Sequence, residues 1–194
     1  MEQAGLTDTQ LRRWRFETFD PEKSVADYAG KRRVAEIKRL CERYAEKPEG
    51  WIILQGEYGT GKTHLAYAIA ARQLEAQQQV FAQNVPDLLD SLRQAFEQDE
   101  KMHLSERMQV IREAGLLVLD DLGKENQTAW GTEKMYQIID YRYRDGLPLV
   151  VTTNEDLSSD RANVDARIRS RLLDTGLASI LALPARDYRR YGGK

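Results

Sequence analysis

Cysteine is almost absent from this chain, which contains only Cys41 among its 194 residues. No disulfide bond can form within such a chain, which excludes the disulfide framework of many small secreted domains. The sequence also has no run of about 18 apolar residues, the length that a membrane-spanning helix needs. Residues 1–16 lack the apolar segment of a signal peptide. These absences favour a protein of the reducing cytoplasm.

An excess of positive charge is absent as well, because 29 basic residues are balanced by 31 acidic ones. Proteins that bind nucleic acid through their overall field are strongly basic, so any DNA contact here requires a local patch. LRRWRF at residues 11–16 is one candidate, since arginines suit phosphates and aromatic rings suit base stacking. A solvated face, or packing of these rings under the leader, is the alternative. KRR at 31–33 and RDYRR at 186–190 are further basic clusters.

Short apolar runs alternate with segments of helical periodicity along most of the chain. The runs predict buried strands over residues 51–55, 79–84, 115–121, 147–154 and 179–184. Helices are predicted over residues 31–46, 62–76, 86–96, 104–113, 132–144 and 163–173. This alternation indicates an α/β domain with a parallel sheet covered on both faces. We expect residues 1–30 to form a polar leader and residues 31–194 to form the domain on which it lies.

The segment GEYGTGKT fits the pattern G-x-x-x-x-G-K-[ST] between a predicted strand and a predicted helix. Glycines let the backbone curl its N–H groups around phosphate oxygens, and the helix N-terminus favours anions. Lys62 can reach the β- and γ-phosphates, and the Thr63 hydroxyl can bind Mg²⁺. His64 is expected to pack or hydrogen-bond rather than catalyse. We assign nucleotide binding to Gly56, Glu57, Tyr58, Gly59, Thr60, Gly61, Lys62, Thr63 and His64.

Polar side chains end two other predicted strands. LLVLDD places Asp120 where a carboxylate can hold Mg²⁺ beside Thr63, and Asp121 can orient an attacking water. Asn154 ends LPLVVTTN, where its amide can contact the γ-phosphate or that water. Because ligands bind at the carboxyl ends of parallel strands, these groups are expected to converge on the glycine-rich loop. A turn-forming role is the alternative for Asp121 and Asn154.

Two arginines are aligned in the segment DARIRSRLLDTG. Ile168 and Leu172 are four residues apart and predict the buried face of a short helix, while Arg167 and Arg171 share a different face. Such a pair forms either a solvated stripe or a donor pair for a phosphate in a neighbouring subunit. The spacing alone leaves both interpretations open. An arginine supplied in trans accelerates phosphoryl transfer by about 10³- to 10⁵-fold.

Together, GEYGTGKTHLA, LLVLDDLG, YRYRDGLPLVVTTN and RIRSRL resemble the DnaC/DnaI-like helicase loaders. These are AAA+ ATPases related to the initiator DnaA and similar to the IstB transposition helpers. The resemblance covers about residues 15–190. It implies a P-loop NTPase fold of the ASCE class, a three-layer α/β/α sandwich with a five-stranded parallel sheet. The implied strand order is 5-1-4-3-2. In a departure from larger AAA+ proteins, we expect no C-terminal lid domain, because the sequence ends at RDYRRYGGK. Asp120 and Asp121 would be the Walker B acids, Asn154 the sensor 1 residue and Arg171 the arginine finger.

The same resemblance implies an enzyme that binds ATP and Mg²⁺ and hydrolyses ATP to ADP and phosphate, slowly outside an assembly. Its partners would be a hexameric replicative helicase, single-stranded DNA and further copies of the chain that associate through Arg171. The function implied is helicase loading in DNA replication. Two alternatives stay open: an IstB-like transposition helper, and an ATP-dependent assembly switch with little hydrolysis. The acids Asp120 and Asp121 favour hydrolysis over the switch.

Overall fold

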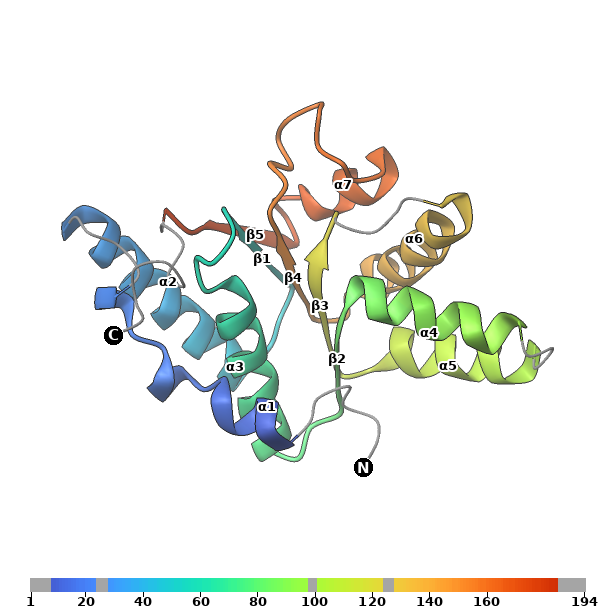
Figure 1. Cartoon of the computed structure of the whole chain (residues 1–194), viewed down its shortest axis with the longest axis horizontal. Helices are drawn as coiled ribbons and strands as arrows, with labels where there is room; N and C mark the ends of the chain where they lie inside the picture. Colours follow the sequence, from blue (N-terminus) through green and yellow to red (C-terminus); the bar gives the residue numbers. More distant parts are fainter. Residues whose placement is uncertain (1–7, 24–27, 98–100, 124–127, 185–194) are drawn as a thin grey trace.

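The structure is a computed structural model that describes residues 8–23, 28–97, 101–123 and 128–184. In this part of the chain a five-stranded parallel sheet lies between two layers of helices (Figure 1). The strands are β1 (Trp51–Gln55), β2 (Val80–Asn84), β3 (Leu116–Leu122), β4 (Leu149–Thr153) and β5 (Ala178–Ala182). Their order is β2-β3-β4-β1-β5, which confirms the predicted order 5-1-4-3-2 read from the opposite edge.

Helices cover both faces of the sheet (Figure 1). One layer contains α1 (Asp8–Arg13), α2 (Tyr28–Glu46) and α3 (Lys62–Glu75), together with the 3₁₀ turns η2 (Phe16–Thr18) and η3 (Pro21–Lys23). The other contains α4 (Val85–Glu97), α5 (Lys101–Glu113), α6 (Ala129–Arg144) and α7 (Ala166–Leu172). Within the described ranges, none of these helices has the length and apolar character needed to cross a membrane.

Alternate residues of the central strands enter two separate cores. In β1, Ile52 and Leu54 belong to the core beneath α2 and α3. Trp51 and Ile53 belong to the core beneath α4, α5 and α6. All four side chains are buried. A strand covered on both faces needs an apolar residue at each position, which explains the continuous run WIIL.

Capping side chains set the starts of two helices that the sequence pattern placed three residues away. α6 begins at Ala129 because the Thr128 hydroxyl accepts a hydrogen bond from the N–H of Gly131. α7 begins at Ala166 because the Asp165 carboxylate accepts one from the N–H of Arg167. Apolar periodicity locates a helix, whereas a polar residue before it fixes the first turn. The predicted starts at residues 132 and 163 are therefore wrong by one turn.

The leader is packed into the first core through its aromatic rings. Phe16 is 2% exposed and Phe19 is 7% exposed, and both belong to the cluster that includes α2 and α3. The Trp14 ring stacks on Tyr67 of α3 with a centroid distance of 4.7 Å. These rings are consequently engaged within the fold. Because Phe16 is buried, its ring has no free face for base stacking, and the alternative of aromatic packing under the leader is confirmed for this residue.

Candidate functional site

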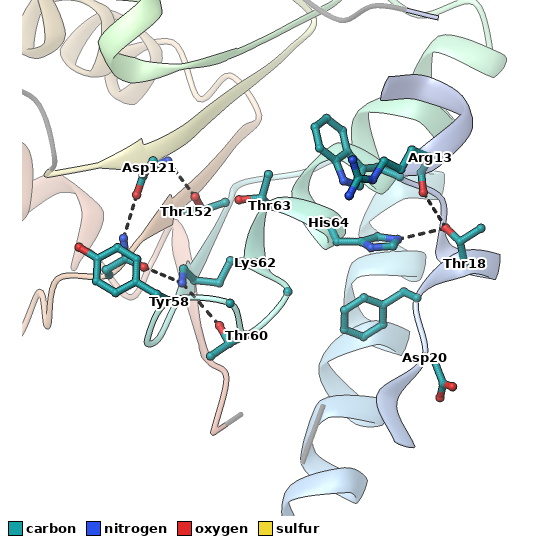
Figure 2. A pocket seen from close by; sticks show the side chains of 15 residues that line it. Arg13, Thr18, Asp20, Tyr58, Thr60, Lys62, Thr63, His64, Asp121 and Thr152 are labelled. Atoms are coloured by element: carbon teal, nitrogen blue, oxygen red, sulfur yellow. Dashed lines mark hydrogen bonds between the residues drawn. The ribbon is translucent and has the colours of Figure 1, made fainter. Parts of the chain in front are cut away.

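The loop between β1 and α3 brings the first turn of α3 to the carboxyl end of the sheet (Figure 2). Gly61, the last residue before α3, has a φ of +94°, in the left-handed region that favours glycine. A Cβ atom on Gly61 would lie 2.6 Å from Cε2 of Phe19. Any other residue here would be strained and would clash with the leader. The path of the loop therefore requires glycine at this position.

Lys62 is buried at the start of α3, with its ammonium group turned back over the loop. Its Nζ donates hydrogen bonds to the backbone oxygens of Gly56 at 2.8 Å and Glu57 at 2.7 Å, and to Oδ1 of Asn154 at 2.8 Å. A buried ammonium group is costly unless acceptors surround it. Phosphate oxygens carry full charge and are stronger acceptors than these neutral ones. A bound phosphate would therefore displace the neutral acceptors from the ammonium group of Lys62.

Thr63 and Asp120 meet beneath the loop. The Thr63 hydroxyl donates to Oδ1 of Asp120 over 2.9 Å, and Asp120 is 6% exposed. Burial raises the pKa of Asp120, and hydrogen bonds from Thr152 and Thr63 oppose this rise because they stabilise the carboxylate. Mg²⁺ prefers oxygen ligands and is held in many nucleotide sites by one hydroxyl and one carboxylate. This pair of residues fits Mg²⁺.

Asp121 occupies an irregular position at the end of β3. Its φ is +66°, which is uncommon for a residue other than glycine. The pairing of β3 with β4 shifts register between Leu119 and Leu122, so Asp121 lies outside the regular ladder. Its Oδ1 accepts a hydrogen bond of 2.8 Å from Nδ2 of Asn154, the residue that follows β4. Asn154 thus links Lys62 to Asp121 through its two amide atoms.

A cavity of about 560 Å³ lies between the loop and the leader (Figure 2). This volume is within the usual range of ligand pockets, about 300–1,000 Å³. Residues 58–64 line one side, and Asp121, Thr152 and Asn154 line the strand ends. The leader contributes Arg13, Trp14, Thr18, Phe19 and Asp20. The cavity is therefore polar at the strand ends and partly aromatic toward the leader.

His64 fastens the leader to the first turn of α3. Its Nε2 lies 2.8 Å from the backbone oxygen of Arg15, and because a carbonyl oxygen can only accept, Nε2 carries the proton. The same nitrogen lies 3.2 Å from the Thr18 hydroxyl, and the edge of the ring packs against Phe19. Burial lowers the pKa of His64. A neutral imidazole in this position holds the leader against the cavity.

Arg171 does not line the cavity and instead packs on α6. Its Nε donates to Oδ1 of Asp140 over 2.9 Å and its Nη2 donates to the Tyr136 hydroxyl over 3.0 Å. Arg167 also stacks on Tyr136, with its guanidinium carbon 4.2 Å from the ring centroid. The aligned arginines are therefore held on α6 and do not form a freely solvated stripe. Ile168 and Leu172 are buried, as their spacing predicts.

The structure brings together Lys62, Thr63, Asp120, Asp121 and Asn154 and keeps Arg171 apart from them within one chain.

Sequence reasoning missed the leader residues of the cavity. The spacing of three residues between Phe16 and Phe19 was an available signal, since side chains at i and i+3 eclipse in a 3₁₀ turn. It also missed Thr152, a polar residue within an apolar strand. The RDYRR cluster lies outside the described residues.

A glycine-rich loop before a helix, with acids and an amide at neighbouring parallel strand ends, defines a P-loop domain of the AAA+ class. The chain belongs to the IstB-like ATP binding protein family, whose sequence profile matches residues 9–189. The match covers the loop, the acids, Asn154 and Arg171. It confirms the resemblance found in the sequence.

Curated relatives of the chain come from both branches of this group. YdaV of Escherichia coli, described as uncharacterized, is 30% identical over 154 residues, or 79% of this chain. The putative ATP-binding protein of insertion sequence IS232 from Bacillus thuringiensis is 26% identical over 149 residues, or 76% of this chain. The replicative helicase loader DnaI of Bacillus subtilis is 28% identical over 120 residues, or 61% of this chain. The matches cover only 55%, 58% and 38% of these relatives, respectively.

Solved structures confirm the fold. A crystal structure of the DnaC helicase loader superposes with a TM-score of 0.72 at 21% sequence identity. The match covers 89% of this chain and 98% of that one. The AAA+ architecture is therefore shared over nearly the whole of both chains. The family consists of helicase loaders and IstB-like ATPases, and both kinds of protein are similar to this chain.

Proposed function

We propose that this protein binds Mg·ATP in the cavity between the glycine-rich loop and the leader, and hydrolyses it. The observation that carries the proposal is the hydrogen-bonded chain from Lys62 through Asn154 to Asp121. It joins a cation at the start of α3 to an amide and a carboxylate at the ends of β4 and β3. The γ-phosphate and an attacking water need these three groups in one place.

Different residues of the cavity contact the phosphates, the Mg²⁺ ion and the base of the nucleotide. The loop backbone cradles the phosphates, and Lys62 exchanges its carbonyl partners for β- and γ-phosphate oxygens. Thr63 and Asp120 hold Mg²⁺, which when bound neutralises charge on the phosphates. Phe19 and Trp14 contact the base end of the nucleotide, because the aromatic part of the cavity lies toward the leader.

Water attack on the γ-phosphate uses the groups at the ends of β3 and β4. Asp121 accepts a hydrogen bond from the water and Asn154 fixes its position. Within one chain the guanidinium of Arg171 is bound to Asp140 and Tyr136 and lies outside the cavity. We propose that it acts on the nucleotide of an adjacent copy. The protein is then slow alone and faster when assembled, because each site is completed by its neighbour.

In the cell, we propose that the ATPase loads a hexameric replicative helicase onto single-stranded DNA. The similarity to DnaI and DnaC supports this role. The family profile and the insertion-sequence relative support a second candidate, a helper ATPase for transposition. Co-elution of the purified chain with the helicase from the same source is expected for the first role. Co-elution with a transposase and not with the helicase would establish the second.

ATP turnover, measured across protein concentrations with and without single-stranded DNA, tests hydrolysis. Turnover per chain is expected to rise with concentration and with DNA. Asp121→Asn is expected to bind ATP normally and to lower kcat by about 100-fold, because an amide is a poor acceptor for the proton of the water. Flat, negligible turnover with tight ATP binding would instead identify an assembly switch. Equal turnover in the wild type and in Asp121→Asn would refute the role of this acid.

A partly exposed aromatic cluster on the opposite face from α2 suits single-stranded DNA. We call this cluster the Trp130 patch, and it consists of Arg93, Phe96, Trp130 and Lys134. The rings of Phe96 and Trp130 are 6.3 Å apart, and Phe96 is 50% exposed. Arg93 and Lys134 lie over the Trp130 ring at 5.8 Å and 5.9 Å. Rings for stacking and cations for phosphates are thus combined on one surface.

Replacing Phe96 with alanine is expected to weaken binding of a fluorescent oligothymidine by about 5- to 100-fold, as the loss of one stacked base implies. Tyr28→Ala is a matched control, because Tyr28 is 76% exposed and lies under Arg32 on α2, on the other side of the sheet. Fluorescence anisotropy at two salt concentrations separates stacking from phosphate contacts. If both variants lose affinity equally, the Trp130 patch is not the binding surface.

A further inference from the structure

Thr152 is buried in β4 and makes two hydrogen bonds to the acids of the neighbouring strand. Its hydroxyl donates to Oδ1 of Asp120 over 2.6 Å. It also accepts from the backbone N–H of Asp121 over 2.9 Å, the bond drawn in Figure 2. One side chain therefore contacts both acids, the first through its carboxylate and the second through its backbone. No part of the phosphate-loop pattern or of the acidic strand end identifies this residue.

The second of these bonds compensates for the irregular end of β3. The register shift between Leu119 and Leu122 removes Asp121 from the regular ladder, where its N–H would otherwise pair with β4. Its backbone is also in the left-handed region, with a φ of +66°. Such a conformation persists only where the surroundings hold it. The Thr152 hydroxyl supplies the missing acceptor.

We propose that Thr152 is a positioning residue for ATP hydrolysis. Its hydroxyl orients the Asp120 carboxylate beside Thr63 and holds the backbone of Asp121 so that the Asp121 side chain meets Asn154. Thr152 acts through these two acids and needs no contact with the nucleotide. This inference rests on the proposed function and adds a residue to the same site.

A hydroxyl can perform both tasks, because it donates one hydrogen bond and accepts another. Valine has nearly the shape of threonine but leaves the Asp121 N–H without its acceptor and removes a donor from Asp120. Serine retains the hydroxyl and loses only a methyl group. Thr152→Val and Thr152→Ser therefore separate the hydrogen bonds from the packing.

The next residue provides a matched control. Thr153 is buried in the same strand, and its hydroxyl also donates one hydrogen bond and accepts another. Its partners are the backbone oxygen of Leu122 at 2.8 Å and the N–H of Glu155 at 3.0 Å, and neither is an acid side chain of the site. Thr153→Val removes the same chemistry from the same strand and leaves Asp120 and Asp121 with their partners.

The three variants are compared with the wild type in Mg²⁺ titrations of nucleotide affinity, in kcat, and in the hydrogen exchange of the Asp121 amide. Thr152→Val is expected to raise the Mg²⁺ concentration for half-maximal binding by about tenfold, the loss of one hydrogen bond to a charged group. It is expected to lower kcat by about 100-fold, as displacement of a reacting group does. ATP affinity without Mg²⁺ and the values for Thr152→Ser are expected to stay within about threefold of the wild type.

Faster exchange of the Asp121 amide in Thr152→Val, reversed by serine and unchanged in Thr153→Val, is the signature of positioning. Equal losses of kcat and Mg²⁺ affinity in the two valine variants would overturn the inference, because they would reflect lost stability. An unchanged Asp121 amide in Thr152→Val would also overturn it. A wild type without turnover would refute the proposed hydrolysis instead, and amide exchange with Mg²⁺ affinity would still decide the role of Thr152.

Discussion

Lys62→Ala is expected to weaken ATP binding by about 1,000-fold, which corresponds to the loss of two or three hydrogen bonds to a charged group. Lys62 is 6% exposed, and its Nζ already lies among acceptors of the glycine-rich loop. Bound phosphates would contact the same ammonium group, and because Lys62 is buried, water would compete little for it. Isothermal titration with ATP and Mg²⁺ measures the effect directly.

Lys47→Ala provides the control for a change of net charge. Lys47 is an exposed lysine that pairs with Glu49 and lies outside the cavity. Its removal is expected to leave ATP affinity within about twofold of the wild type, because exposed ion pairs contribute little. Thermal unfolding of both variants shows whether the loop still folds. ATP affinity of Lys62→Ala within a factor of three of the wild type would exclude the proposed phosphate site.

The strands of the sheet could be predicted from the sequence because each one is marked by a continuous run of apolar residues. WIILQ matches β1 in both bounds, and the strand predicted over 115–121 matches β3 to within one residue at each end, since central parallel strands need apolar residues on both faces. The strand order was not local information. It came from the resemblance of four motifs to a known family, and the structure confirms it.

Other features depend on contacts between distant parts of the chain. Phe19 packs against Gly61, and the Thr18 hydroxyl meets His64, yet neither pair is marked by spacing or by composition. The leader therefore looked like a polar extension although its rings enter the core. Thr152 was similarly hidden, because its role follows from a register shift in the neighbouring strand. Side-chain partners on different strands are set by tertiary packing. No local pattern in a single sequence reveals these contacts.

The direction of Arg171 illustrates the same limit and leads to an expected effect as large as that of Lys62→Ala. Spacing placed it on an outward face, whereas the structure holds it with hydrogen bonds to Asp140, Tyr136 and the backbone oxygen of Arg167. To meet a phosphate of a neighbouring chain, the guanidinium has to exchange these partners. In the proposed mechanism, a charged phosphate from the neighbouring chain makes this exchange favourable, which would couple activation to assembly. Arg171→Ala is expected to retain ATP binding and to lose about 10³-fold in assembly-stimulated turnover.

Loss of the contacts with α6 would also destabilise α7, so Arg171→Ala alone does not distinguish a catalytic role from a structural one. Asp140→Asn provides the structural comparison, because it weakens the same contact and keeps the arginine. This variant is expected to share part of the loss in thermal stability but to keep its response to protein concentration and DNA. If both variants lost turnover in proportion to their stability, Arg171 would be a structural residue only.

Mixing two inactive variants gives the decisive measurement. Lys62→Ala keeps Arg171 but is expected to leave its own site empty at an ATP concentration far below its weakened affinity, whereas Arg171→Ala is expected to bind ATP but lacks the arginine. In a mixed assembly, Lys62→Ala chains would supply Arg171 to the nucleotides of Arg171→Ala chains, so turnover is expected to reappear in the mixture. Its dependence on the ratio of the two proteins should pass through a maximum, because each active site needs one chain of each kind. A mixture as inactive as its components would show that no arginine acts across the interface.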